Sequence, residues 1–405
     1  MANNNENKIL NGPHLRFPEF TEEWKETKLG KIAEITKGSG ISKDRLSEYG
    51  SPCILYGELY TKYKSEIINE VYSRTELDSS LLVKSKANDV IIPCSGETAI
   101  DISTARCVPF NNILLGGDLN IIRLKNNDGG FFAYQLNGTR KKDIARVAQG
   151  VSVVHLYGEN LKHIRVYHPA IEEQKKITRL LSLIDKRIAT QNKIIYKLKS
   201  LIRGIMVELQ KRGLSNGTWK KVLLSNVLTE RNELNKSLYP VYSVSVIQGI
   251  VNQMEYLGRS FAASDTSKYH VVHYGDLVYT KSPTGSFPYG IIKQSYNQNE
   301  VAVSPLYGVY EPKTFSTGVF LHEYFKSELN TLNYLHPLVQ KGAKNTINIA
   351  NQRFLESYVA IPSNANELLA ISKLLCSLNT KLEFLQNILK QSQGQKQYLL
   401  RQMFI

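Results

Sequence analysis

Two long stretches of the chain carry apolar residues at alternating steps of three and four positions, which is the spacing of a coiled-coil seam. The pattern predicts one helix over residues 170–212 and another over residues 364–405. Each would hold about 40 residues and be about 60 Å long. The two seams match at a constant offset, as Ile177 and Ile371 illustrate. The seam positions are Ile177, Leu181, Ile184, Ile188, Ile195, Leu198, Ile202 and Leu209 in the first helix, and Ile371, Leu375, Leu378, Leu382, Leu385, Leu389 and Leu399 in the second.

The two seams are expected to pack against each other within one chain. A pseudo-twofold relation between the two halves would make the helices antiparallel. Polar or flexible residues interrupt the second seam at Ser392, Gly394 and Lys396. We expect this break either to loosen one end of the helix pair or to make room for another protein.

Short apolar and β-branched runs precede each helix and predict strands. Each series opens with a Trp-Lys pair, at Trp24 and at Trp219, which predicts a short strand followed by a helical turn. Residues 89–93 are matched by residues 276–280. The sequence therefore predicts an α+β fold, in which two similar mixed α/β domains are separated by two long antiparallel coiled-coil helices in a pseudo-twofold internal repeat. The predicted parts are an N-terminal extension (1–20), a first domain (21–169), a first helix (170–212), a second domain (213–363) and a second helix (364–405).

The chain of 405 residues has a formal net charge of +15. This charge favours a polyanionic partner, nucleic acid before a membrane surface, although a basic protein without such a partner explains the charge alone almost as well. The four cysteines are scattered without a CxxC pair, which favours neither a zinc ribbon nor a redox motif. The N-terminus lacks an apolar signal core, and no apolar run is long enough to span a bilayer. We therefore expect a cytoplasmic protein.

Motifs for catalysis are missing from the sequence. It contains no GxxxxGK[ST] phosphate loop, no Asn-Pro-Pro-aromatic motif for base methylation, no HExxH and no Gly-x-Ser-x-Gly. His270 and His273 have no obvious third metal ligand and are expected on a strand. The sequence thus predicts no catalytic residue, no metal site and no cofactor in this chain.

Basic and amide side chains gather near glycine turns in both predicted domains and suggest a DNA-binding surface. Lys and Arg suit phosphate contacts, whereas Gln, Asn, Ser and Thr can contact base edges. Most exposed Lys and Asn side chains do nothing specific, so each residue alone is a weak signal. The recurrence of a loop after Gly150 and after Gly342 strengthens the hypothesis. The candidates are Lys37, Ser39, Lys43, Arg45, Ser95, Arg140, Lys141, Arg146, Gln149, Ser152 and His155 in the first domain, and Tyr242, Gln248, Lys268, Lys281, Tyr289, Lys341, Lys344, Asn345 and Asn348 in the second.

The order of these features resembles the specificity (S) subunit of Type I restriction-modification systems. The residues that carry the resemblance are Leu15-Arg16-Phe17-Pro18-Glu19-Phe20, the Trp-Lys-x-x-x-Leu-Gly entry at Trp24, Asp89-Val90-Ile91-Ile92, the Gly150 loop, and the Pro-x-x-x-Glu-Gln-x-x-Ile pattern from Pro169 to Ile177. The resemblance covers essentially the whole chain. The second half departs from it, because Asn364-Ala365-Asn366-Glu367 replaces the Glu-Gln motif.

The resemblance implies a non-catalytic, sequence-specific DNA-binding subunit of a DNA adenine methyltransferase and Type I restriction endonuclease complex. Each target-recognition domain would read one half of a bipartite asymmetric target in double-stranded DNA, and the helices would set the spacer. Two modification (M) subunits would dock on the chain and bring S-adenosylmethionine, and restriction (R) subunits would bring ATP and Mg. Two alternatives remain: a coiled-coil adaptor with basic nucleic-acid- or protein-binding domains, and a methyltransferase or nuclease with its own active site, which the missing motifs disfavour.

Overall fold

The computed structural model describes residues 11–259, 262–341 and 347–405. The chain divides into two compact units. Unit 1 consists of residues 1–192 and 387–405, and unit 2 consists of residues 193–386. Among the described residues, no helix is both long and apolar enough to span a bilayer.

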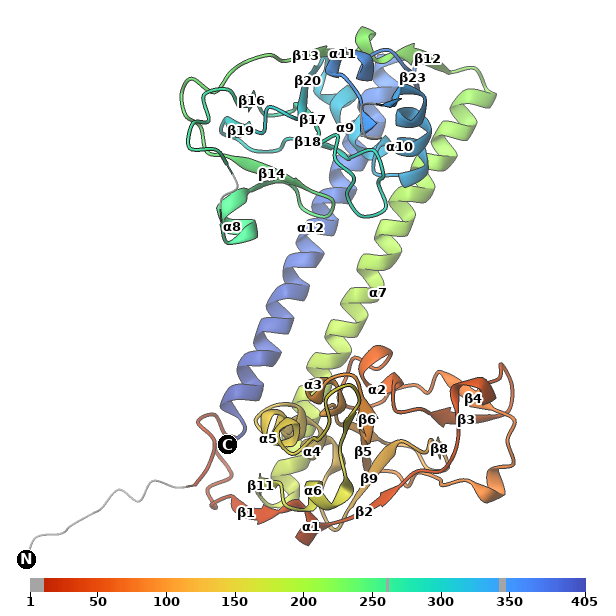
Figure 1. The fold of residues 1–405 in the computed structure, drawn as a ribbon, viewed down its shortest axis with the longest axis vertical. Helices are drawn as coiled ribbons and strands as arrows, with labels where there is room; N and C mark the ends of the chain where they lie inside the picture. The colour runs from red at the N-terminus through yellow and green to blue at the C-terminus, as the bar shows by residue number, and fades with distance from the viewer. Residues whose placement is uncertain (1–10, 260–261, 342–346) are drawn as a thin grey trace, which may run out of the picture. The chain divides into compact units, whose positions relative to one another are not determined.

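Two long helices, α7 (Ile171–Ser215) and α12 (Ala365–Gln402), each contribute one part to each unit (Figure 1). The two helices predicted from the seam pattern are therefore present. Acidic residues occupy the first turn of both helices and basic residues the last turn, which complements the helix dipole.

A four-stranded antiparallel sheet forms the centre of the domain in unit 1. Its side chains alternate between two cores. Val90 and Ile92 point into the core that contains residues of α7, whereas Ile91 points into a smaller core on the other face. In sheet order the strands are β2 (Ala33–Lys37), β9 (Leu119–Leu124), β5 (Asp89–Pro93) and β7 (Arg106–Val108), and a second sheet has the order β4 (Ser73–Thr75), β3 (Ser51–Ile54) and β8 (Leu114–Leu115).

The two ends of the unit 1 domain pair with each other. β1 (Lys25–Lys28) runs antiparallel to β11 (Arg165–His168), which leads directly into α7. Trp24 is buried edge-on against Phe131, with ring centroids 5.5 Å apart. Because α1 (Leu29–Ile32) follows β1, the predicted strand and helical turn are confirmed.

Unit 2 repeats the strand order of the central sheet of unit 1. Its central sheet consists of β13 (Leu228–Glu230), β20 (Gly308–Pro312), β17 (Leu277–Tyr279) and β18 (Ile292–Gln294), and β12 (Trp219–Leu223) pairs with β23 (Tyr358–Pro362). Trp219 is buried edge-on against Phe320 at 5.4 Å, as Trp24 is in unit 1. The mixed α+β class and the internal repeat of the fold are therefore confirmed.

The repeat extends to a buried aspartate at the start of the central strand. Asp89 and Asp276 each accept a backbone N–H from the residue three positions earlier. Each also forms a two-pronged ion pair with an arginine, Asp89 with Arg123 (2.9 and 2.8 Å) and Asp276 with Arg231 (2.8 and 3.2 Å). Arg123 lies on β9 and Arg231 directly follows β13, so the two halves satisfy the same buried charge from different sequence positions.

The remaining elements lie around these two sheets. In unit 1 they are η1 (Lys43–Arg45), α2 (Glu58–Thr61), η2 (Ser79–Leu81), β6 (Ser95–Gly96), α3 (Ala99–Ile102), α4 (Gly129–Asn137), α5 (Lys141–Arg146), β10 (Val154–His155) and α6 (Gly158–Lys162). In unit 2 they are η3 (Leu224–Asn226), β14 (Tyr242–Ser245), β15 (Gly249–Asn252), α8 (Gln253–Leu257), β16 (His270–Val272), β19 (Val301–Val303), α9 (Phe315–Tyr324), α10 (Glu328–Leu335), η4 (His336–Leu338), β21 (Gln340–Lys341), β22 (Ile347–Asn348) and α11 (Asn351–Phe354).

The seam residues of α7 and α12, except Ile195 and Leu389, pack into the core of the unit in which they lie. Among them, Ile177, Leu181, Ile184, Ile195, Leu198, Ile202, Ile371, Leu375 and Leu399 are buried, and Ile188, Leu209, Leu378, Leu382, Leu385 and Leu389 are half-buried. Within each unit the two helix segments run antiparallel (Figure 1). The seams therefore join the helices to each other and to the domain beside them.

Lys396, in the polar break of the second seam, is held by ion pairs with two carboxylates. Lys396 Nζ lies 2.6 Å from a carboxylate oxygen of Glu66, in the domain, and 2.6 Å from one of Asp185, on α7. The Tyr134 hydroxyl donates to the other oxygen of Asp185 (2.7 Å). Burial opposes the charge on Lys396, but the two carboxylates raise its pKa above the ordinary value. The expectation of a loosened helix end is therefore wrong.

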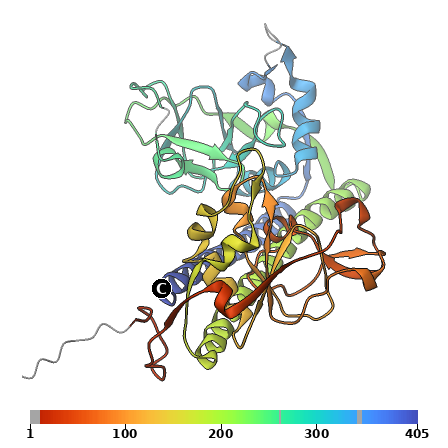
Figure 2. The ribbon, with the colours of Figure 1, turned by 60° about the horizontal axis from the view of Figure 1, so that its bottom comes forward.

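The N-terminal segment fastens the start of α7 and the end of α12. Arg16 donates twice to Glu173 of α7, both at 2.7 Å, and Lys176 stacks over the ring of Phe17 at 4.5 Å. The segment also lies beside the last turn of α12 (Figure 2), where the Leu15 N–H donates to the carbonyl of Gln402 (2.8 Å). Residues 15–20, which we call the N-terminal clasp, thus contact both the start of α7 and the end of α12 within unit 1.

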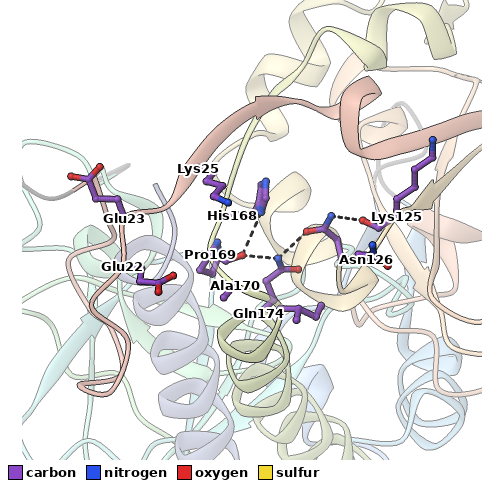
Figure 3. A pocket seen from close by; sticks show the side chains of 11 residues that line it. Glu22, Glu23, Lys25, Lys125, Asn126, His168, Pro169, Ala170 and Gln174 are labelled. Atoms are coloured by element: carbon purple, nitrogen blue, oxygen red, sulfur yellow. Dashed lines mark hydrogen bonds between the residues drawn. The ribbon is translucent and has the colours of Figure 1, made fainter.

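A cavity of about 250 Å³ opens beside the first turn of α7. Gln174 lies on its wall and donates to the carbonyl of Pro169 and to the side chain of Asn127, both at 2.9 Å (Figure 3). Glu22, Glu23, Lys25 and Lys125 also line the cavity. Because both charge signs face it, the cavity has no clear preference for an anion or a cation.

Candidate nucleic-acid interface

A short hairpin in unit 1 carries several of the candidate residues. Gln149 and His155 exchange backbone hydrogen bonds of 2.9 and 2.7 Å, and β10 continues the hairpin beside β6. Gly150 has a φ of +121°, and a side chain there would meet the Val153 carbonyl oxygen at 2.1 Å. The tight turn therefore requires glycine.

The hairpin projects candidate side chains into solvent. Gln149, Ser152 and His155 are exposed, and the His155 ring stacks on Tyr157 with centroids 6.2 Å apart. Amide, hydroxyl and imidazole groups on a narrow hairpin can form hydrogen bonds with base edges in a DNA major groove, which admits a two-stranded ribbon.

The end of the central sheet supports the hairpin. Asn120 of β9 is fully buried and donates to the carbonyl of Leu156 (2.9 Å), which holds the hairpin against the sheet. Lys37, at the exposed end of β2, pairs with Asn120 in register. Ser95 lies opposite His155 in the strand pair, but it is buried and its hydroxyl donates to Asp118 (3.2 Å). The structure thus brings Lys37, Ser95 and the hairpin together.

The basic run before the hairpin divides into internal and exposed residues. Arg140 donates to the backbone carbonyl of Ile405 (3.1 Å) and stacks over Tyr167 at 5.4 Å. Lys141 donates to Thr104, and burial lowers its pKa. Arg146 is 75% exposed and is paired with Asp143. Of the three candidates in this run, Arg146 is therefore the best placed to contact phosphate.

Ser39, Lys43 and Arg45 lie on the loop after β2. The Ser39 hydroxyl accepts the Val83 N–H at 2.8 Å and so holds two loops together. Lys43 and Arg45 are exposed on η1, and the Arg45 carbonyl accepts a hydrogen bond from Thr75 of β4. These two cations therefore lie beside the three-stranded sheet, away from the hairpin strands.

In unit 2, the equivalent end of the central sheet holds two candidates. Lys281 follows β17 with a φ of +61°, a left-handed conformation that is uncommon for lysine. Tyr289 precedes β18, and its carbonyl accepts the Tyr279 hydroxyl (2.7 Å). Lys281 is half-buried, and this burial lowers its pKa.

The other unit 2 candidates lie on neighbouring loops. Gln248 is exposed at the turn between β14 and β15, Tyr242 is half-buried on β14, and Lys268 is exposed before β16. Lys344 and Asn345 lie outside the described residues. For Lys341 and Asn348 the structure describes only the backbone, in β21 and β22, which pair antiparallel.

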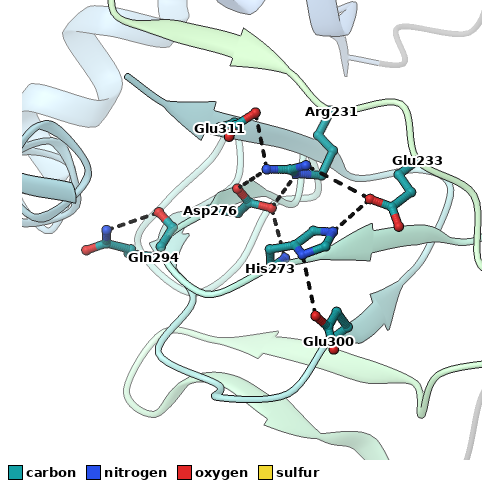
Figure 4. A network of polar contacts seen from close by, with 8 residues as sticks. Arg231, Glu233, His273, Asp276, Gln294, Glu300 and Glu311 are labelled. Atoms are coloured by element: carbon teal, nitrogen blue, oxygen red, sulfur yellow. Dashed lines mark hydrogen bonds and ion pairs between the residues drawn. The ribbon is translucent and has the colours of Figure 1, made fainter. Parts of the chain in front are cut away.

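A polar network at the opposite end of the unit 2 sheet does not suit phosphate. Arg231 contacts Asp276 and Glu311 (3.2 Å), and His273 contacts Glu233 (2.7 Å) and Glu300 (3.8 Å) (Figure 4). Carboxylates outnumber cations here, so this end repels a polyanion. The interface is therefore better sought at the end that holds Lys281 and Tyr289.

Sequence reasoning missed several exposed groups next to its candidates, among them Val151, which is 97% exposed beside Ser152. Tyr157 is 44% exposed beside His155, and Ile247 is 83% exposed beside Gln248. The available signal was an aromatic or β-branched residue within a turn of small and polar residues.

The sequence is similar to one protein family and to a known protein. Residues 21–200 match the family model of the Type I restriction modification DNA specificity domain. The specificity subunit of the Type I restriction enzyme MjaVIII from Methanocaldococcus jannaschii is 24% identical over 204 residues, which cover 49% of this chain and 44% of that protein. The matched stretch is thus less than half the length of that relative.

The fold is similar to a solved structure over nearly the whole chain. The crystal structure of the S subunit of a Type I restriction-modification system from M. genitalium aligns with a TM-score of 0.64, covering 97% of this chain and 99% of that chain at 15% identity. At this identity the likeness concerns the fold alone. Residues 21–200 are therefore similar to the Type I restriction modification DNA specificity domain, and the chain as a whole shares the fold of a Type I restriction-modification S subunit.

Proposed function

We propose that this chain gives a Type I restriction-modification complex its DNA sequence specificity and carries no catalytic group of its own. Each domain reads one half of a bipartite asymmetric target in double-stranded DNA. Helices α7 and α12 set the spacer between the half-sites and dock two modification (M) subunits. The complex works in the cytoplasm, where its DNA substrate is accessible.

One observation carries the proposal. The strand order of the domain matched over residues 21–200 recurs in unit 2, with different exposed side chains at the corresponding sheet end. Two versions of one DNA-specificity fold in one chain suit two different half-sites. The net charge of +15 favours the polyanionic partner.

The reaction chemistry belongs to the partners. The M subunits supply S-adenosylmethionine and methylate adenine, and restriction (R) subunits add ATP- and Mg-dependent cleavage. This chain binds and orients the DNA. Exposed cations such as Arg146 contact phosphate, and hairpin side chains such as Gln149 and His155 contact base edges.

The test is methylation by the purified chain and its M subunit, together and apart, followed by mapping of the methylated adenines. We expect one defined bipartite sequence to be methylated, and only when both proteins are present. Replacing residues 21–169 with the corresponding domain of another family member should then change one half-site and leave the other intact.

Two results would contradict the proposal. Methylation by the chain alone would mean that it carries its own active site. Loss of recognition at both half-sites after the domain exchange would rule out two independent readers. Binding to protein or RNA with no effect on methylation would support the coiled-coil adaptor instead.

A further inference from the structure

The two most exposed large apolar side chains among the described residues both lie at hairpin tips, although the hairpins occupy different positions in the two domains: the first lies between α5 and α6, and the second between β13 and β16. Val151 is 97% exposed at the tip of the 149–155 hairpin in unit 1. Ile247 is 83% exposed at the tip of the β14–β15 hairpin in unit 2. Each domain therefore presents a strongly exposed β-branched side chain at a hairpin tip, and Val153 of the unit 1 hairpin is also 52% exposed.

Both tips have the same composition. In unit 1, Gln149 and Gly150 precede Val151, and in unit 2, Gln248 and Gly249 follow Ile247. Both glycines have positive φ, +121° and +77°, so both turns depend on a residue without a side chain. Both glutamines are exposed beside the apolar residue.

Backbone hydrogen bonds hold the two tips in place. Gln149 and His155 close the first hairpin, as described above. In the second, the Ser245 hydroxyl accepts the N–H groups of Ile247 and Gln248, both at 3.3 Å, and the strands pair over four residues each. The exposed side chains are thus displayed on ordered turns, which limits the entropy lost on binding.

Exposure alone would mean little, because single apolar side chains are common on protein surfaces. Here each domain carries such a group at the tip of a hairpin, although the two hairpins are not counterparts in the repeat. Each hairpin is narrow enough for a major groove, and each group lies beside an amide that can bind adenine. In that groove the apolar group displayed by a base pair is the 5-methyl of thymine.

Resting on the function proposed above, we infer that Val151 and Ile247 are specificity-determining residues that each contact the 5-methyl group of a thymine, one in each half-site. Gln149 and Gln248 then lie beside the neighbouring base pair, where each amide can donate to and accept from an adenine. The two half-sites therefore each contain a thymine whose methyl group contributes to recognition.

The test measures the binding affinity of protein variants and DNA variants, first singly and then in combination. The full chain with its M subunit binds duplexes of the mapped target in which each thymine in turn is replaced by deoxyuridine, which removes only the methyl group. Burial of one such carbon contributes about fourfold in affinity. We expect one deoxyuridine in each half-site to weaken binding about fourfold, and Val151→Ala or Ile247→Ala to weaken it about four- to fifteenfold.

The cycle also assigns each residue to its half-site. In the Val151→Ala complex, the sensitive deoxyuridine of one half-site should have no further effect, while the other half-site keeps its sensitivity, and Ile247→Ala should show the converse. The controls are Leu81→Ala and Leu306→Ala, which truncate side chains that are 82% and 72% exposed in the same two units. Both should bind as the wild type does.

Several results would overturn the inference. They are wild-type binding that is insensitive to every deoxyuridine, alanine variants with unchanged affinity, or an alanine variant whose binding is weakened without any deoxyuridine effect. An equal loss in the Leu81→Ala control would also overturn it. A complex that methylates no defined sequence would instead refute the proposed function, so the two failures are distinguishable.

Discussion

At the scale of single residues, two glutamates at matching positions of the long helices have different partners. Glu173 of α7 binds Arg16, whereas Glu367 of α12 accepts the indole N–H of Trp219 at 2.8 Å. Trp24, the counterpart of Trp219, is buried, and its indole nitrogen has no hydrogen-bond partner within the described part of the chain. The N-terminal clasp has thus taken the carboxylate that a tryptophan uses in unit 2.

This difference predicts unequal effects of the same substitution. Both Trp24→Phe and Trp219→Phe lose a similar amount of packing. Only Trp219→Phe also breaks a hydrogen bond to a carboxylate, so we expect it to cost about 1–2 kcal/mol more in free energy of unfolding. Glu367 is half-buried, so water offsets part of that loss. Urea unfolding followed by circular dichroism measures both variants, and equal destabilisation would contradict the assignment of the two donors.

Residue roles were the least predictable part of the candidate interface. Arg140 and Arg146 are equally basic in the sequence, but Arg140 binds a carbonyl at the far end of the chain while Arg146 stays exposed. Local pattern contains no information about such a long-range partner. The Arg16–Glu173 pair was visible only as two separate motifs, and their contact depends on the fold.

At the scale of elements, the sequence predicted what periodicity controls. The two long helices, the strands beside the tryptophans and the central strands at 89–93 and 276–280 are all present. The short strand β10 was expected only as part of the loop after Gly150, because a two-residue strand is too short to show an alternating pattern. The effect of Lys396 on the helix end was predicted wrongly for a different reason. Periodicity shows that a polar residue interrupts the seam, but it does not show which buried carboxylates pair with that residue.

The Lys396 cluster gives a prediction for helix α12. Lys396→Leu leaves two buried carboxylates, Glu66 and Asp185, without their cation, and this should destabilise unit 1 by about 3–5 kcal/mol. Adding Glu66→Gln and Asp185→Asn removes those charges and should restore most of the loss. Trp24 lies in unit 1 and Trp219 in unit 2. Denaturation followed by Trp24 fluorescence in a Trp219→Phe background therefore reports the unit 1 effect.

The control for this cluster is Lys390→Leu, which removes an exposed lysine from the same helix. It should change stability by less than about 0.5 kcal/mol. If Lys396→Leu were equally mild, or if the triple variant were no more stable than the single one, the ion cluster would not be what fixes the end of α12.

At the scale of the whole molecule, the proposed function makes the helices a spacer between two half-sites. The chain passes from unit 1 to unit 2 between Asn192 and Lys193 on α7, and back between Gln386 and Asn387 on α12. One heptad inserted at both places lengthens each helix by about 10.5 Å while keeping the seam in register. Because B-DNA rises about 3.4 Å per base pair, the preferred spacer should lengthen by up to about three base pairs.

The measurement is methylation of a set of duplexes that share both half-sites and differ in spacer length. The doubly inserted chain should prefer a longer spacer than the wild type while recognising the same half-sites, because both domains are unchanged. A heptad placed in α7 alone offers a matched control, since it shifts one seam against the other and should destabilise the chain. An active, doubly inserted complex that keeps the wild-type spacer would mean that something other than helix length sets the distance between the half-sites.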